Sequence, residues 1–185
     1  MMAMDQPPPD RLSARHSTRL RGFDYASNAA YVVTLCAHHR RPLFGTIRDG
    51  QMRPSWLGTI VEREWHRTAQ LRRGVLLDAF ILMPNHLHGI LILNLPEGGP
   101  RGEGRVGRFV SPSAGLGAIV RGFKSAVTAT ARREQPGGMG PVWQRGFHDH
   151  IIRDEAQLGR FRRYIADNVQ QWELDRYFQR EGKWR

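Results

Sequence analysis

Cysteine and long apolar runs are both scarce in this sequence of 185 residues. The single cysteine, Cys36, excludes an intrachain disulfide framework and a multi-cysteine zinc site, and its apolar surroundings predict an inert buried thiol. No uninterrupted apolar run reaches the roughly 18 residues of a membrane-spanning helix. Residues 1–10 are rich in proline and lack the apolar core of a signal peptide. We therefore expect a cytoplasmic protein with no membrane partner.

Acidic residues and lysine are also few. The chain has 17 Asp and Glu against 28 Lys and Arg, a formal net charge of +11, and only Lys124 and Lys183 are lysines. This excess points to a polyanionic partner, and arginine offers a planar fork for phosphate and a flat face for stacking on bases. A GC-rich genome would also enrich arginine, but it explains the choice of arginine over lysine better than the total charge imbalance.

The hydrophobic share of 40% is enough for one domain with a real core. Residues 1–21 are basic and lack apolar periodicity, so they form either a solvated tail or an arm along nucleic acid, and residues 22–185 form the single domain. Periodicity and turn residues first predict a strand at 31–36, a hairpin at 43–52, and a helix at 59–71 capped by Gly58 or Thr59. A strand through 80–93 and a long connection at 94–115 follow. The remaining predicted elements are a helix from 116 to 127, a strand at 142–153, and a helix that Asp154 caps and that reaches Trp172. This order predicts an α+β fold, a ferredoxin-like antiparallel sheet covered by helices.

The domain is organised around residues 83–89, with the sequence MPNHLHG. His86 and His88 are two positions apart, so on a strand both imidazoles lie on one face while Leu87 points into the opposite layer. Such a pair can bind a divalent metal; alternatively, one or both are core histidines with backbone partners. The proline within this apolar run predicts one central strand with a kink or bulge at Pro84 and Asn85.

Tyr164 and Asn168 are four residues apart on the last predicted helix and therefore share one face. A tyrosine hydroxyl is a competent nucleophile toward a phosphodiester, and covalent attachment divides cleavage and rejoining into two steps. A metal would activate the phosphate, and Asn168 could add an oxygen ligand to the histidine pair. In the simpler alternatives, Tyr164 is a half-buried packing residue and Asn168 only caps or ends the helix.

Four further residues are candidates for contact with nucleic acid. Arg121 and Lys124 lie on the polar face of the second predicted long helix, where they are either solvated or placed for phosphate contact. Trp143 and Arg145 could stack on exposed bases. Trp143 fits the core equally well, and Trp65 is expected in the core because it lies on the apolar side of its helix.

Five motifs occur together, in one order, within residues 22–176. They are MPNHLHG at 83–89, IVRGFKS at 119–125, VWQR at 142–145, HIIR at 150–153 and YIADN at 164–168. In this combination the chain resembles the single-tyrosine HUH transposases, and within them the REP-associated tyrosine transposases. The resemblance implies a ferredoxin-like (RRM-like) nuclease fold that binds single-stranded hairpin DNA of the repetitive palindromic type. It also implies a cytoplasmic protein at the nucleoid that is a monomer or a homodimer.

The resemblance also implies a role for each matched site residue. His86, His88 and Asn168 would be the metal ligands, with Mg²⁺ or Mn²⁺ as the ion. Tyr164 would be the nucleophile that forms a 5′-phosphotyrosine and frees a 3′-hydroxyl, so the implied enzyme is a DNA-nicking and strand-transfer transposase.

The sequence departs from the family's pattern at two places. Val169 stands where relatives usually have proline, which leaves the Asn168 ligand intact and affects only where the helix ends. Phe147 and His148 stand where relatives tend to have a tyrosine pair, which makes Tyr164 the clearer nucleophile.

Two functions from different classes remain open. One is the metal-dependent DNA-nicking enzyme, and the other is a non-catalytic, domesticated nucleic-acid-binding protein that keeps the basic surface. The presence of both histidines, the tyrosine and the asparagine favours the enzyme. An RNA-binding ferredoxin-like domain is a weaker alternative, because this sequence lacks the strand signature of that class. A histidine-triad hydrolase is excluded because Ile90 occupies the alternate position after His88.

Overall fold

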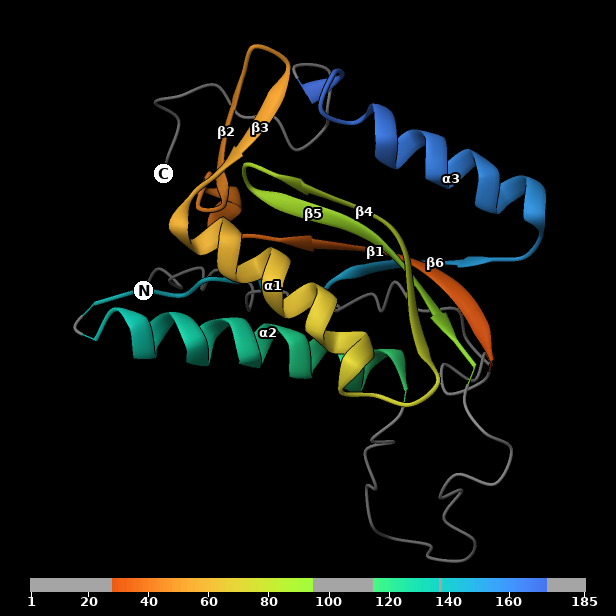
Figure 1. Cartoon of the computed structure of the whole chain (residues 1–185), viewed down its shortest axis with the longest axis horizontal. Helices are drawn as coiled ribbons and strands as arrows, with labels where there is room; N and C mark the ends of the chain where they lie inside the picture. Colours follow the sequence, from red (N-terminus) through yellow and green to blue (C-terminus); the bar gives the residue numbers. More distant parts are fainter. Residues whose placement is uncertain (1–27, 95–114, 137, 173–185) are drawn as a thin grey trace, which may run out of the picture.

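The computed structural model describes residues 28–94, 115–136 and 138–172. Within these residues, four strands form an antiparallel sheet in the order β4-β5-β1-β6 (Figure 1). The strands are β1 (Ala29–Cys36), β4 (Val75–Met83), β5 (His86–Leu93) and β6 (His148–Ile152). The helices are α1 (Trp56–Gln70), α2 (Leu116–Glu134) and α3 (Glu155–Asp167). The chain order β1, α1, β4, β5, α2, β6, with β1 and β5 central, confirms the ferredoxin-like fold.

Different helices cover the two faces of the sheet, α1 and α2 on one side and α3 on the other (Figure 1). Tyr31 and Leu35 of β1 point into the core beneath α1 and α2. Val32 points the other way, as alternate residues of a strand do, and packs with Ile90 and with Ile165 of α3. The sheet is therefore apolar on both faces, and each face has its own core.

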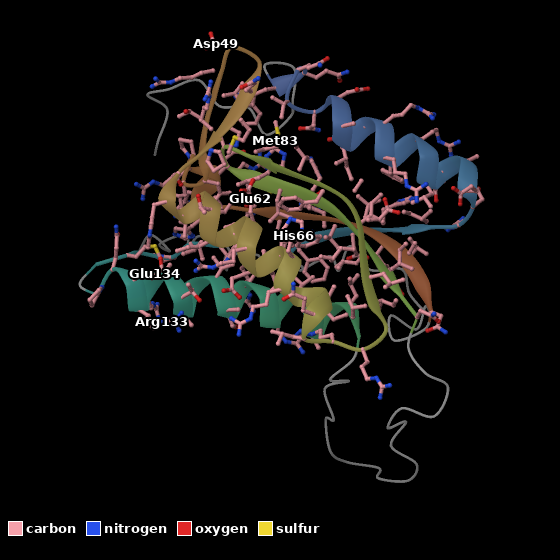
Figure 2. All side chains as sticks on the ribbon, viewed as in Figure 1. Asp49, Glu62, His66, Met83, Arg133 and Glu134 are labelled. Atoms are coloured by element: carbon pink, nitrogen blue, oxygen red, sulfur yellow. The ribbon has the colours of Figure 1, made fainter. Side chains whose placement is uncertain are left out.

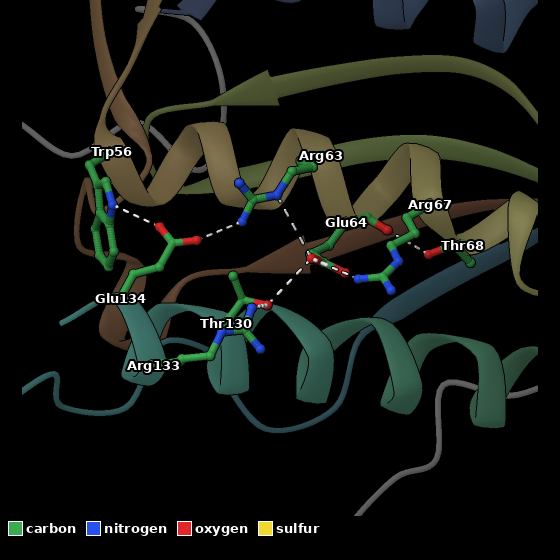
Figure 3. Close-up of polar contacts among 8 residues, drawn as sticks. All are labelled: Trp56, Arg63, Glu64, Arg67, Thr68, Thr130, Arg133 and Glu134. Carbon is green, nitrogen blue, oxygen red and sulfur yellow. Dashed lines mark hydrogen bonds and ion pairs between the residues drawn. The ribbon is translucent and has the colours of Figure 1, made fainter. Parts of the chain in front are cut away.

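Polar contacts across the interface, both exposed and buried, join α1 to α2 (Figure 3). Glu134 accepts hydrogen bonds from Arg63 Nη2 at 2.9 Å and from Trp56 Nε1 at 3.2 Å. Glu64 is buried between the helices, and the Thr130 hydroxyl donates to its carboxylate at 3.4 Å. Trp65, the next residue, lies in the core as expected. These contacts hold the two helices together beneath the sheet.

The predicted hairpin is confirmed by β2 (Gly45–Arg48) and β3 (Gln51–Pro54), which pair around a two-residue turn. Asp49 and Gly50 have φ values of 53° and 68°, the left-handed backbone that this turn requires. Figure 2 shows Asp49 at the tip of the hairpin and Met83 at the end of β4. A short 3-10 turn, His38–Arg40, lies between β1 and this hairpin in the chain.

The prediction of one kinked strand through residues 80–93 is wrong. The chain reverses at Pro84 and Asn85, and Met83 pairs with His86, so the segment is a tight hairpin of β4 and β5. Both faces of the sheet are covered, so the apolar run shows no alternation that would reveal two strands. The proline and asparagine, which favour turns, mark the reversal and not a bulge.

The start of the first helix also differs from the prediction. Helix α1 begins at Trp56, and the Ser55 side chain caps it by accepting from the Gly58 N–H at 3.0 Å. Serine is a strong N-cap residue. Gly58 lies inside the helix, at a position where a Cβ would collide with the Phe44 carbonyl. This glycine therefore allows close packing and does not cap the helix.

The strand predicted at residues 142–153 is shorter in the structure. Trp143 forms only an isolated bridge with Ala37, and regular pairing begins at His148 in β6. Gly146 has a φ of 76°, a left-handed conformation that interrupts an extended strand.

Helix α3 confirms the predicted cap, since the Asp154 side chain accepts from the Gln157 N–H at 2.6 Å. It ends at Asp167 with Asn168 as the C-cap, ahead of the predicted limit at Trp172.

Cys36 is buried, as expected. The basic segment 1–21 and residues 95–114 of the predicted connection lie outside the described residues. Among the residues that are described, no helix is long and apolar enough to cross a membrane.

Candidate active site

His86 and His88 open strand β5 directly after the tight turn, and both imidazoles lie on the face that α3 covers. Leu87 between them packs into the core beneath α1 and α2, so the predicted geometry is confirmed. The two histidines are 0% and 2% exposed. Their Nε2 atoms lie 3.1 Å apart, and the rings meet nearly edge to face. The structure therefore brings two ligand-type nitrogens to one point.

The opposite nitrogen of each ring has its own partner. Asn85 Nδ2 donates to the Arg40 carbonyl at 3.1 Å, so its Oδ1 faces His86 Nδ1, 2.8 Å away. His88 Nδ1 lies 2.8 Å from the Thr34 hydroxyl, which β1 places directly opposite in the sheet register. A ring nitrogen that donates to such an acceptor leaves Nε2 with its lone pair. Both rings can therefore present Nε2 as an electron-pair donor.

Tyr164 reaches this pair from α3. Its hydroxyl lies 3.3 Å from His88 Nε2, and the two rings are 5.2 Å apart. The side chain is 43% exposed, and a hollow of about 510 Å³, also lined by His148 and His150, lies beside it. Tyr164 thus contacts a histidine and also lines an open hollow.

Asn168 is buried at 3% exposure, and its Oδ1 makes no hydrogen bond among the described residues. An unsatisfied buried carbonyl costs about 1–3 kcal/mol. Tyr164, four residues earlier, contacts His88, and Trp172, four residues later, contacts His86 with ring centroids 6.0 Å apart. Asn168, the C-cap of α3, thus lies in the chain between two residues that contact the histidines.

A salt bridge fixes α3 to the edge of the sheet. Arg162 donates to both carboxylate oxygens of Asp78, through Nε at 3.0 Å and Nη2 at 2.6 Å. Asp78 lies where the β4–β5 register shifts, between Leu77 and Phe80. The hydrogen bond from Arg162 lowers the pKa of the Asp78 carboxyl, against the effect of partial burial. The bridge thus holds the helix that carries the tyrosine two residues further on.

The predicted nucleic-acid contacts are divided between two places. Arg121 and Lys124 belong to α2, on the opposite side of the sheet from the histidines. Burial lowers the pKa of Lys124 to about 8, and its ammonium group donates to the carbonyls of Gln144, at 2.9 Å, and Gly146. In this structure Lys124 therefore holds the segment that leads into β6.

Trp143 combines a packing role with partial exposure. Its ring packs against Phe44 and Phe123, and its Nε1 donates to the Lys124 carbonyl at 3.2 Å. Arg145 is exposed and lines the hollows beside the site. Thus Arg145 lies near the histidine face, whereas Trp143 is anchored in the core beneath α2.

Sequence reasoning did not find Thr34 and Asn85 as partners of the histidines. Asn85 directly precedes His86 in the motif, which is a usable signal, whereas Thr34 becomes visible only through the strand register. It also did not single out His150 as a site residue, although the alternation of His148 and His150 in β6 was a usable signal. A strand places alternate residues on one face.

Fold and site together define a ferredoxin-like domain in which a histidine pair and a helical tyrosine meet on one face of the sheet. No protein-family model matches the sequence. A protein of Haemophilus influenzae described as uncharacterized is 36% identical over 169 residues, which are 89% of this chain and 93% of that protein. The chain belongs to the same family as this Haemophilus influenzae protein.

A solved structure shares the fold. It is a REP-associated tyrosine transposase bound to a REP hairpin, and it matches with a TM-score of 0.58 at 17% sequence identity, over 86% of this chain and 76% of that one. The likeness supports the α+β fold inferred from strand order and helix placement.

Proposed function

We propose that this protein is a metal-dependent endonuclease and strand transferase that acts on single-stranded DNA bearing a hairpin. The observation that carries the proposal is the hydroxyl of the partly exposed Tyr164, which lies 3.3 Å from one of two histidines whose Nε2 atoms converge. The net charge of +11 suits a polyanionic substrate. The neighbour of the same fold was solved with a hairpin bound, which supports the substrate class.

The donor set fits a divalent metal. Two nitrogen ligands at about 2.1 Å from one ion and at right angles to each other lie about 3.0 Å apart, close to the 3.1 Å between the histidine Nε2 atoms. The unsatisfied Oδ1 of Asn168 is the third candidate donor. Among the described residues no cluster of three or more His, Cys, Asp or Glu could hold an ion, and we assign the third position to the amide oxygen of Asn168.

His86, His88 and Asn168 would hold Mg²⁺ or Mn²⁺, which suit a site of neutral donors completed by phosphate oxygens and water. When bound, the ion would polarise the scissile phosphate. Thr34 and Asn85 orient the two imidazoles by holding their Nδ1 atoms. Tyr164 supplies the nucleophile: a bond forms between its oxygen and phosphorus, the bond from phosphorus to the 3′ oxygen breaks, and the hydroxyl proton passes in net terms to that oxygen.

The products of this step are a 5′-phosphotyrosine and a free 3′-hydroxyl, which can attack the adduct in the reverse direction. The step is reversible because a phosphodiester is exchanged for another ester and no hydrolysis occurs. Joining to a different 3′-hydroxyl would amount to strand transfer.

The test uses labelled single-stranded hairpin DNA from beside the protein's own gene, incubated with Mn²⁺ and analysed on a denaturing gel. Wild type should give a covalent protein–DNA band. Tyr164→Phe should lose the band and keep hairpin binding, because only the reacting oxygen is removed. Tyr31→Phe is the matched control, since Tyr31 is fully buried beneath α1 and α2, and it should retain the band.

Two outcomes would contradict the proposal. An undiminished band in Tyr164→Phe would remove this residue from the mechanism. Tight hairpin binding with no band from wild type at any Mn²⁺ concentration would identify a non-catalytic DNA-binding protein.

A further inference from the structure

The two histidines of the site have different kinds of partner at Nδ1. Asn85 Nδ2 lies 3.1 Å from the Arg40 carbonyl, which can only accept, so Oδ1 is the amide atom that faces His86 Nδ1 at 2.8 Å. An amide oxygen can only accept as well, so His86 Nδ1 must carry the hydrogen. In a neutral imidazole this leaves Nε2 with its lone pair. The asparagine therefore holds His86 in one tautomer.

Thr34 imposes no such choice on His88. A threonine hydroxyl both donates and accepts, and it rotates to suit its partner. At 2.8 Å it can donate to a bare Nδ1 of His88 or accept from a protonated one. Thr34 lies directly opposite His88 in the register of β1 and β5, and both residues are buried. The hydroxyl is therefore held against Nδ1 whichever tautomer His88 adopts.

The contact between the two Nε2 atoms decides the tautomer of His88 in protein free of divalent ions. The atoms are 3.1 Å apart, a distance at which two bare nitrogens would set their lone pairs against each other, whereas one N–H makes a hydrogen bond. His86 Nε2 carries no hydrogen, so His88 Nε2 must carry it. Both rings are buried, which disfavours the charge that a further proton would add. His88 Nδ1 is then bare and accepts from the Thr34 hydroxyl.

The same pair of nitrogens suits a divalent ion only after His88 has changed tautomer. A ligand nitrogen must offer a lone pair, and His86 Nε2 offers one already. His88 must lose the hydrogen at Nε2 to water and take one up from water at Nδ1, where the Thr34 hydroxyl turns to accept it. The ring is neutral before and after this change, so the pair neither gains nor loses a proton.

Tyr164 is affected by the same change. Its hydroxyl lies 3.3 Å from His88 Nε2, so the tyrosine oxygen faces an N–H donor while Nε2 carries the hydrogen. A lone pair that accepts this hydrogen cannot attack phosphorus. Once the hydrogen is on Nδ1, Nε2 no longer donates to the tyrosine. The tautomer of His88 thus sets both a ligand lone pair and the hydrogen bonding of the nucleophile.

We propose that His88 is a tautomer switch, with its hydrogen on Nε2 in protein free of divalent ions and on Nδ1 when an ion is bound. Asn85 keeps His86 in the ligand tautomer throughout. Thr34 is the positioning residue that makes the switch possible, because its hydroxyl pairs with Nδ1 in both states. This inference rests on the proposed function for the identity of the two histidines as metal ligands.

The test is nuclear magnetic resonance of the imidazole nitrogens in protein labelled with ¹⁵N-histidine, at an alkaline pH where an ordinary imidazole is neutral. A nitrogen that carries a hydrogen and a bare nitrogen resonate far apart, so the spectrum reports the tautomer of each ring. Zn²⁺ is the probe, because it is diamagnetic and binds imidazole nitrogen. His86→Gln and His88→Gln identify the two sets of signals. His66, which is exposed on α1, is the internal control.

Without Zn²⁺, His86 should carry its hydrogen on Nδ1 and His88 on Nε2. With stoichiometric Zn²⁺, the hydrogen of His88 should appear on Nδ1, while His86 keeps its tautomer and His66 is unchanged. Thr34→Val should show the wild-type tautomers without Zn²⁺ and bind Zn²⁺ about 10–100-fold more weakly, since valine cannot accept from Nδ1. Thr34→Ser is the matched control and should bind and switch as wild type does. Thermal melting establishes that all variants are folded.

Three results would overturn the inference. A hydrogen on His88 Nδ1 before Zn²⁺ is added would mean that both histidines are preset. A change of tautomer at His86 would mean that Asn85 does not hold it, and Zn²⁺ that leaves both rings unchanged would remove the pair as ligands.

These results are independent of the covalent band. If wild type forms the band while His88 carries its hydrogen on Nδ1 with and without the ion, the switch fails and the proposed function stands. A clear switch at His88 without any covalent band gives the reverse.

Discussion

Gly89→Ala should destabilise the protein, because the aromatic core beneath the histidine strand depends on this glycine. A Cβ at position 89 would lie 2.6 Å from Cη2 of Trp65 and closer still to Cζ2. Carbon atoms pack favourably at about 3.5–4.0 Å, so the indole would have to move by about 1 Å. Phe80 stacks on the Trp65 ring at 5.2 Å and Phe123 meets its edge at 5.4 Å, so the ring has little room to move.

Overpacking of this kind costs typically 1–3 kcal/mol, and the severity of the overlap points to the upper part of that range. Removing a glycine from the strand returns about 0.5–1 kcal/mol through the entropy of the unfolded chain. The net loss should be about 2 kcal/mol, which corresponds to about 4–8 °C in Tm for a domain of this size.

Urea and thermal unfolding followed by circular dichroism measure the loss. The matched control is Gly159→Ala on α3, where the nearest atom to a new Cβ is Arg163 Nη1 at 3.7 Å. That change should be neutral or stabilising, by up to about 1 kcal/mol. Combining Gly89→Ala with Trp65→Phe should cost less than the sum of the two single changes, since the smaller ring makes room. Wild-type stability in Gly89→Ala, or strict additivity in the double variant, would refute the packing argument.

Three further outcomes are expected. Thr34→Val should weaken Mn²⁺ binding by about 10–100-fold in calorimetry without DNA, because the substitution removes the partner of His88 Nδ1. Thr34→Ser should bind Mn²⁺ as wild type does, and an unchanged Kd in Thr34→Val would exclude an orienting role for Thr34. Asn168→Ala should raise the Mn²⁺ concentration needed for cleavage at equal thermal stability, and superimposed titration curves would mean that the third ligand is another residue. Because Arg162 lowers the pKa of Asp78, the bridge stabilises the fold above the unfolded-state value of about 3.9 and this stabilisation disappears as the pH falls through the folded-state pKa. Asp78→Asn should therefore be less stable than wild type at pH 7 and no less stable in strong acid, and a difference independent of pH would contradict this.

Local spacing was sufficient to predict the central features of the site. His86 and His88 face one side because a strand alternates its side chains, and Tyr164 and Asn168 share one side of α3 because a helix repeats every 3.6 residues. The same reasoning placed Leu87 and Trp65 in the core. These predictions depend only on the type of element, which the apolar pattern indicates.

Features that depend on contacts between distant segments were not predicted. The turn at Pro84 was read as a kink because a segment covered on both faces gives the same apolar pattern as one strand or two. Thr34 became a partner of His88 only through the register of β1 against β5. Arg160 lines a hollow together with His150 only because α3 packs beside β6. Charge patterning alone directed attention to Arg121 on α2, since a basic helix face looks the same on either side of a sheet.

The most direct test of the central claim is mass spectrometry of the protein after reaction with hairpin DNA and Mn²⁺. Nuclease digestion of the DNA followed by proteolysis would leave a nucleotide remnant on the attacking residue. The account predicts that the remnant is joined through a 5′-phosphate to Tyr164 and that it is absent when the divalent metal is chelated. A remnant on another residue, or formed equally well with the metal chelated, would contradict it.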